Sequence, residues 1–272
     1  MHRIAVLASI MAIAPVYAQA FLTQNNGPFI NVGSSIVKGQ TIKPFTATWS
    51  MKQPIKGEWR EVATITETLK QSKVDEKLIM VREQITRIPS TEGQQIETIS
   101  FNPETLEPIS LKVESKGKFP PQAVKEGHVD YKGTLVTGSL TTFEDKTVEI
   151  KQENTIPMFE TAMLGLIIAA LPLKEGYTAE LPANFVLQGT KWFVRVRVSG
   201  RKTFDAGNGK KVEAWAVETD WREAKSDSEY SYSGGTGGSG GTYYVVPNPP
   251  SGFPLVPQYI NSSVNIEVIP AK

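Results

Sequence analysis

Few residues in this chain are suited to acid–base or nucleophilic chemistry. The 272-residue sequence contains two histidines, His2 and His128, and no cysteine. Because His128 and Asp130 are two residues apart, a strand would place both side chains on one face, where they could meet. A serine triad also needs a serine in contact with that histidine, and the spacing does not supply one. We therefore expect a surface histidine beside acidic neighbours and no catalytic residues.

One glycine-rich segment matches a nucleotide-binding pattern in form only. Residues 235–240 read G-x-G-x-x-G, but a strand-like Thr-Tyr-Tyr-Val-Val follows them. A dinucleotide site needs a strand before this motif, a helix after it and a later acidic residue. The match reflects low sequence complexity, and we expect no nucleotide and no other cofactor.

The composition also limits metal chemistry. The absence of cysteine excludes disulfides, thiolate zinc sites and iron–sulfur clusters, and no calcium-loop motif is present, so we expect no metal. Acidic side chains recur along the strand-like segments, and we interpret them as solvated surface. A hydrolase with paired carboxylates stays open as a third hypothesis, because such residues meet only in the fold. These acidic residues are Glu58, Glu61, Glu67, Glu83 and Glu97.

Two arginines could form an anion-binding patch. Arg195 and Arg197 fall on the same face of a strand-like segment. The alternative, which we favour, is that they face water and pair with Glu213 or Glu218 on the neighbouring strand.

Apolar side chains offer a stronger hypothesis than polar ones. The segment 157–171 is apolar nearly all round and begins and ends beside prolines, which predicts a buried helix about 22 Å long. Tryptophans recur in the strand-like segments and could line an apolar cavity or simply fill the core. We predict that an apolar ligand would contact Phe159, Met163, Leu166 and Ile167 from the helix, and Trp49, Trp192 and Trp215 from the sheet.

These candidates must be positioned by strands. From residue 44 onward, apolar and polar residues alternate in runs of 6–12 residues separated by turn signals, as in a half-buried antiparallel sheet. In the second run, Trp59, Ala63, Ile65 and Leu69 share one face. We predict a mainly β fold, an antiparallel and strongly curved sheet or half-open β-barrel, with one apolar helix packed on its concave face.

The chain divides into three parts. Residues 1–20 have a short basic start, an apolar run of about 11 residues, and small residues at positions −3 and −1 of a cleavage site after Ala18 or Ala20, as in a secretory signal peptide. That run is too short to span a bilayer, so we expect no transmembrane span after cleavage. An N-terminal arm (21–43) and a single β-rich domain (44–272) follow, the domain carrying a flexible glycine-rich loop at 233–241.

The net charge argues against nucleic acid as a partner, and the signal-peptide pattern predicts an exported protein. The 29 basic and 28 acidic side chains nearly cancel, which argues against nucleic-acid binding. With no cysteine beside the cleavage site, the chain cannot be lipidated there. A cysteine-free exported chain suggests the bacterial periplasm.

The second half of the chain resembles a family of uncharacterised exported bacterial proteins, domain of unknown function 3108 (DUF3108). The resemblance extends over about 44–270, with the glycine-rich stretch as an insertion, and its motifs include no catalytic signature. That family is similar in architecture to the periplasmic lipoprotein carriers, so the resemblance implies binding of a hydrophobic ligand or an envelope component. It rests on the segments 170–176, 196–200, 211–218, 243–246 and 254–255.

Two functional hypotheses therefore lead. The first is a non-enzymatic periplasmic protein that binds a lipid or other apolar ligand between sheet and helix. The second is an assembly factor that binds an envelope protein through a strand edge or mobile loops. A connected cavity would favour the first hypothesis, and a filled interior would favour the second.

Overall fold

The computed structural model describes residues 27–119, 123–207, 209–224 and 240–271, and these form one sheet of 15 strands around a short helix. The proposed leader and most of the glycine-rich loop lie outside the described residues. The first eight strands are β1 (Phe45–Ile55), β2 (Glu58–Val74), β3 (Lys77–Ile88), β4 (Gly93–Phe101), β5 (Pro108–Lys116), β6 (Val124–Lys132), β7 (Leu135–Thr142) and β8 (Thr147–Glu153). The others are β9 (Phe159–Glu160), β10 (Thr178–Phe185), β11 (Thr190–Asp205), β12 (Lys211–Glu223), β13 (Thr242–Val245), β14 (Gln258–Asn261) and β15 (Ile266–Pro270).

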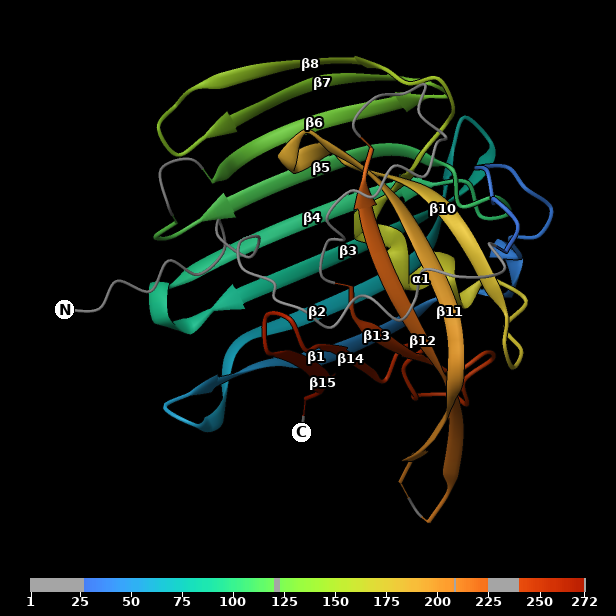
Figure 1. Cartoon of the computed structure of the whole chain (residues 1–272). Helices are drawn as coiled ribbons and strands as arrows, with labels where there is room; N and C mark the ends of the chain where they lie inside the picture. Colours follow the sequence, from blue (N-terminus) through green and yellow to red (C-terminus); the bar gives the residue numbers. More distant parts are fainter. Residues whose placement is uncertain (1–26, 120–122, 208, 225–239, 272) are drawn as a thin grey trace.

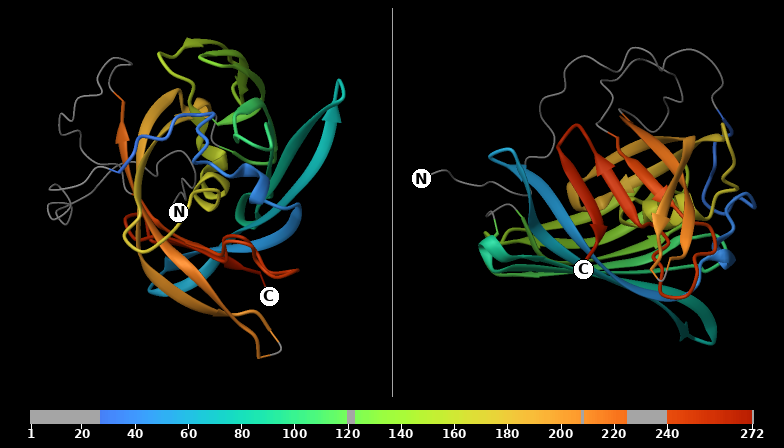
Figure 2. Two further views of the ribbon diagram at one scale, coloured as in Figure 1. Left: turned by 90° about the vertical axis from the view of Figure 1, so that its right-hand side faces the viewer. Right: turned by 90° about the horizontal axis from the view of Figure 1, so that it is seen from below.

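Strands that follow one another in sequence pair with one another, except at one seam. The sheet order runs from β8 down to β1, then to β15, and down again from β15 to β9. All pairings are antiparallel except β9 with β10, which is parallel. The sheet wraps around α1 (Leu164–Ala169) and leaves β8 and β9 as its two unpaired edges (Figures 1 and 2).

The expected fold class is confirmed: the protein is mainly β, with a curved, unclosed sheet and an apolar helix on its concave face. The helix is shorter than the 15 residues predicted. Phe159 and Glu160 instead pair with Ala183 and Asn184 of β10, and a 3-10 turn over Thr161–Met163 precedes α1. Backbone pairing to the sheet therefore replaces the first turns of the predicted helix. No helix among the described residues is long and apolar enough to cross a membrane.

A register shift changes the outer end of β2. Met51 of β1 pairs with Ala63, but Lys52 pairs with Glu61, so Val62 has no partner. Such a β-bulge exchanges the two faces of the strand beyond it. Trp59 and Leu69, which share sequence parity, therefore lie on opposite faces of β2. Trp59 is 53% exposed at a strand end where residues 58–61 are all exposed, whereas Leu69 is buried. The prediction that Trp59 lies on the same face as Leu69 is wrong for this reason.

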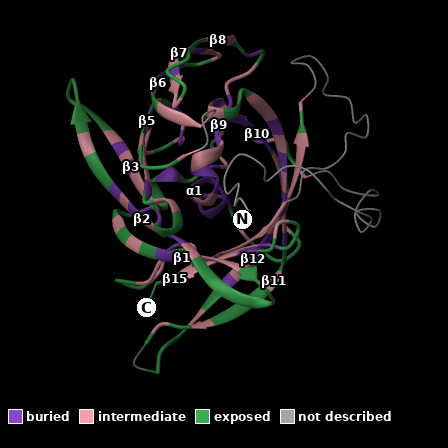
Figure 3. Ribbon diagram, turned by 90° about the vertical axis from the view of Figure 1, so that its left-hand side faces the viewer, coloured by how far each residue is buried: buried purple, intermediate pink, exposed green. Residues whose placement is uncertain are grey.

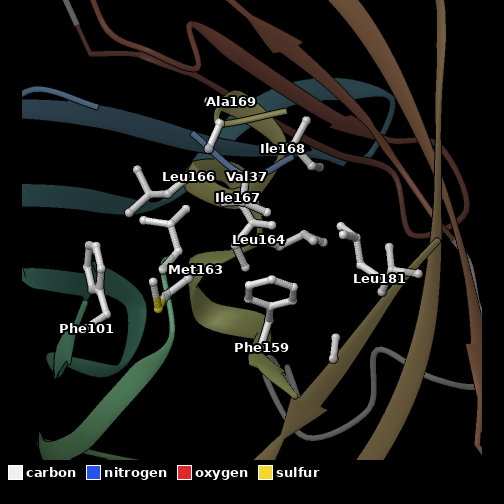
Figure 4. Close-up of a cluster of buried hydrophobic side chains, with 14 of the residues drawn as sticks. Val37, Phe101, Phe159, Met163, Leu164, Leu166, Ile167, Ile168, Ala169 and Leu181 are labelled. Atoms are coloured by element: carbon white, nitrogen blue, oxygen red, sulfur yellow. The ribbon is translucent and has the colours of Figure 1, made fainter. Parts of the chain in front are cut away.

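The apolar core fills the concavity at one end of the sheet. Phe159, Met163 and Ile167 are essentially inaccessible to solvent and meet Phe101 and Leu181 from opposite walls (Figure 4). Burial is concentrated on the inner surface of the sheet and on α1, as Figure 3 shows.

Residues 27–43 pack against this core, although they have little regular structure. The backbone N–H of Lys38 donates to the carbonyl of Ala170, just after α1. Ile30, Val37 and Ile42 are buried in the described part of the arm. The arm therefore helps to hold the helix in place.

Truncation of the central aromatic residue tests this core. We expect Phe159→Ala to lower the free energy of unfolding by about 3–5 kcal/mol, because it leaves a cavity where the wall cannot collapse. Urea unfolding followed by tryptophan fluorescence measures this loss. The control is Val148→Ala on the exposed edge strand β8, for which we expect a change within about 0.5 kcal/mol. A loss below about 1 kcal/mol for Phe159→Ala would show that the core is loosely packed there.

Candidate functional site

A pocket of about 230 Å³ lies where the sheet curls back on itself. Its floor is β1, β2 and β3, one wall is the segment from Thr161 to Leu166, and the other wall is formed by β13–β15 with the loop before β14. The lining residues are Phe45, Trp49, Ile65, Glu67, Arg82, Gln84, Thr161, Ala162, Gly165, Leu166, Tyr243, Leu255, Val256, Tyr259 and Val268.

Most of the pocket surface is apolar or aromatic. The Trp49 indole N–H donates to the Val256 carbonyl at 3.2 Å, which fixes the floor to the far wall. The rings of Tyr243 and Tyr259 are 4.5 Å apart, centroid to centroid. The wall from the helix carries Gly165, where an added Cβ would lie 3.6 Å from Val256 and 3.8 Å from Tyr243. A side chain at position 165 would therefore point toward the opposite wall of the pocket.

The floor of the pocket also holds a buried ion pair. Arg82 Nε donates to Glu67 Oε1 at 2.5 Å, and Arg82 Nη2 donates to Gln84 Oε1. Arg82 and Glu67 are only 7% and 9% exposed. A charge taken out of water at this depth needs a partner, and each supplies one for the other.

A second carboxyl group lies just behind the helix wall. Glu160 is 1% exposed and accepts hydrogen bonds from the hydroxyl groups of Tyr131, at 2.7 Å, and Thr161, at 3.0 Å. Burial raises the pKa of Glu160 to about 7, although its hydrogen bonds act in the opposite direction. Thr161 lines the pocket and donates to Glu160. A change in the protonation of Glu160 therefore acts on a hydrogen bond of the pocket wall.

The structure separates the seven predicted ligand contacts. Trp49 and Leu166 line the pocket. Phe159, Met163 and Ile167 belong to the packed core, and so does Trp192, whose ring meets Trp221 edge to face. Trp215 is half-buried and carries the Arg201 guanidinium over its ring at 4.1 Å. The pocket therefore lies on the side of α1 opposite to most of the predicted set.

Sequence reasoning missed the polar residues of the floor. The expectation of solvated surface is wrong for Glu67, which is buried, whereas Glu97 is half-buried and burial raises its pKa. The signal was their parity: Glu67 shares a face with Ile65 and Leu69. Arg82 likewise shares a face with buried Met80.

The other chemical candidates lie away from the pocket. His128 Nε2 is 3.1 Å from Asp130 Oδ1, as their spacing suggested, and both side chains are about half exposed. Arg197 pairs with Glu218 at 2.7 Å and Arg201 with Glu213 at 2.9 Å, which confirms the expectation of cross-strand pairing for Arg197. Within the described ranges, no three His, Asp or Glu side chains are grouped to hold a metal ion.

Comparison with known proteins gives a family and a distant structural neighbour. A family model described as "Protein of unknown function (DUF3108)" matches residues 44–248. The crystal structure of a β-barrel-like protein of domain of unknown function DUF1849 from Brucella abortus is 12% identical, with a TM-score of 0.48, over 84% of this chain and 96% of that one. No curated protein matches.

The raised pKa of Glu160 makes stability depend on pH. Its carboxyl titrates near 4.5 when unfolded and about 7 when folded, so the folded state binds more protons between these values. We expect stability to fall as pH rises through this window, by at most about 3 kcal/mol from this group. Glu160→Gln, whose amide oxygen can still accept from Tyr131, should flatten the profile of urea midpoints against pH.

Two comparisons complete this test. Glu97 also has a raised pKa, so a smaller slope of the same sign should persist in Glu160→Gln. Exposed Glu153→Gln should leave the profile unchanged. Superimposable profiles for Glu160→Gln and the wild type would contradict the assignment of the raised pKa to Glu160.

Proposed function

We propose that this chain, which belongs to the DUF3108 family of proteins of unknown function, is a non-enzymatic binder of one small apolar or amphiphilic molecule. The observation that carries the proposal is the pocket between α1 and the seam of the sheet. Apolar residues fill the interior on one side of the helix, but on the other side they surround empty space. Burial of apolar ligand surface there would contribute roughly 25 cal/mol per Å².

The size of the pocket sets the size of the ligand. At about 230 Å³ it lies just below the range of roughly 300–1,000 Å³ that is typical of small-molecule sites. This supports a single short alkyl chain or a compact ring system, and it does not support enclosure of a whole two-chain phospholipid.

A binding role accounts for the pocket better than catalysis does. Glu67 is the one carboxylate among the described lining residues, and it is held by Arg82. A glycosidase-like mechanism needs two carboxyl groups facing the same substrate, whereas Glu160 is covered by its own hydrogen bonds behind the wall. The proposal places this binding in the periplasm, on the leader pattern of residues 1–20.

The edge strand β8 does not favour docking of a protein partner. Its exposed residues include Glu149, Lys151 and Glu153. Charged side chains of this kind are how natural proteins protect free edges from pairing. We therefore do not propose the strand-edge form of the second hypothesis at β8.

The first experiment is to isolate the mature protein without detergent and record its native mass, followed by organic extraction. A small apolar or amphiphilic adduct supports the proposal and identifies the ligand class. A clean unliganded mass, together with no binding of added decanol in calorimetry, contradicts it.

Gly165 allows the pocket to be blocked. We expect Gly165→Leu to weaken decanol binding by at least about tenfold, because its side chain occupies the space between Tyr243 and Val256. Calorimetric titration measures the loss. Gly165→Ala is the matched control: its Cβ meets the walls at ordinary contact distances, so binding should persist. Unchanged affinity in Gly165→Leu would show that decanol binds elsewhere.

A further inference from the structure

A second carboxyl group lies on the same face of the sheet as the ion pair on the pocket floor. Glu67, Gln84 and Glu97 occupy directly opposed positions on β2, β3 and β4, in one row across the concave face. Arg82, on the same face of β3, contacts Glu67 and Gln84, and its positive charge also lowers the pKa of Glu97. One guanidinium therefore faces two carboxyl groups, buried Glu67 and half-buried Glu97.

A third carboxyl extends this group. Glu160 and Glu97 are close enough that the charge of Glu97 raises the pKa of Glu160. We call Glu67, Glu97, Glu160 and Arg82 the carboxyl cluster. Arg82 is already neutralised by Glu67, so the cluster has a net charge of zero when Glu97 and Glu160 are protonated and becomes negative when either of them ionises. In neither condition does it offer an unmatched positive charge.

The net charge of the carboxyl cluster determines which ligand head group can lie on the floor of the pocket. An anionic group next to Arg82 would have to displace Glu67 or share the guanidinium with it, which leaves a buried negative charge uncompensated. Like charges close together at low dielectric repel strongly. A neutral head group meets the Gln84 side-chain amide instead, whose Nε2 has only a long 3.4 Å contact with Thr86. A cationic head group is attracted by the surplus of carboxyl groups.

We propose that the pocket selects amphiphiles with an uncharged or cationic head group and rejects anionic ones, with Glu67 and Glu97 as the specificity-determining residues. This inference rests on the proposed function, since it concerns the same pocket. The apolar walls take the alkyl chain, and the carboxyl cluster discriminates by charge.

Three probes with the same alkyl chain and fixed charges test the proposal: decanol, decyltrimethylammonium and decyl sulfate. Titration of the mature protein at about pH 8, below the critical micelle concentrations, can be followed by calorimetry. That pH exceeds the pKa of about 7 of Glu160, so the cluster is negative there. We expect decanol and decyltrimethylammonium to bind at least about tenfold more tightly than decyl sulfate.

Two variants test whether Glu67 and Glu97 cause the preference against the anionic probe. Glu97→Gln and Glu67→Gln each remove one carboxyl group from the cluster, and each should raise the affinity for decyl sulfate relative to decyltrimethylammonium by about tenfold. Glu97→Gln leaves the Glu67–Arg82 ion pair intact, so it keeps the test available if Glu67→Gln fails to fold. Glu83→Gln removes a carboxyl group from the opposite face of β3 to Arg82 and should leave the preference unchanged.

The outcomes separate the two proposals. Equal binding of all three probes in the wild type, or an unchanged preference in Glu97→Gln, would overturn the charge selection and leave the binding function intact. If none of the three probes binds, the proposed function fails and the inference fails with it.

Discussion

The antiparallel pairing of β1 with β15 is the constraint on which the rest of this structure depends. It joins the last strand to the first, so that two runs of sequentially paired strands become one sheet. The seam is continued by the Ala271 N–H, which donates to the Thr48 carbonyl, and by the hydrogen bond of Trp49 to Val256. Without this pairing, the floor and the far wall of the pocket would belong to separate sheets.

The seam also explains why one half of the interior is filled and the other is not. On one side of α1, large side chains such as Phe101 and Phe159 meet across the concavity. On the other side, the sheet turns back through short strands, and Gly165 and Ala162 present little volume toward it. The space that remains is therefore a consequence of small residues on the helix wall and of the curvature at the seam.

The buried charges carry a cost that the fold compensates locally. Arg82 is paired with Glu67 and bonded to Gln84, and Glu160 receives hydroxyl donors from Tyr131 and Thr161. Replacing such groups by apolar residues is often neutral or stabilising in other proteins. Their presence beside a pocket, at positions whose neighbours are apolar, is the kind of conflict between local pattern and buried environment that accompanies functional sites.

The sequence by itself determined the fold class, because alternation with period two and frequent turn residues leave few architectures other than a curved antiparallel sheet. It also determined that the apolar segment around α1 is buried, and that Trp49 and Leu166 are among the candidate contacts. Only the tertiary structure decided the rest. The bulge at Val62 placed Trp59 on the opposite face from Leu69, and pairing with β10 drew Phe159 and Glu160 out of the predicted helix. Glu67, Arg82 and Glu97 lie on three successive strands, so their parity indicates a shared face, but their convergence depends on the register of two hairpins, which the alternation of residue types does not specify.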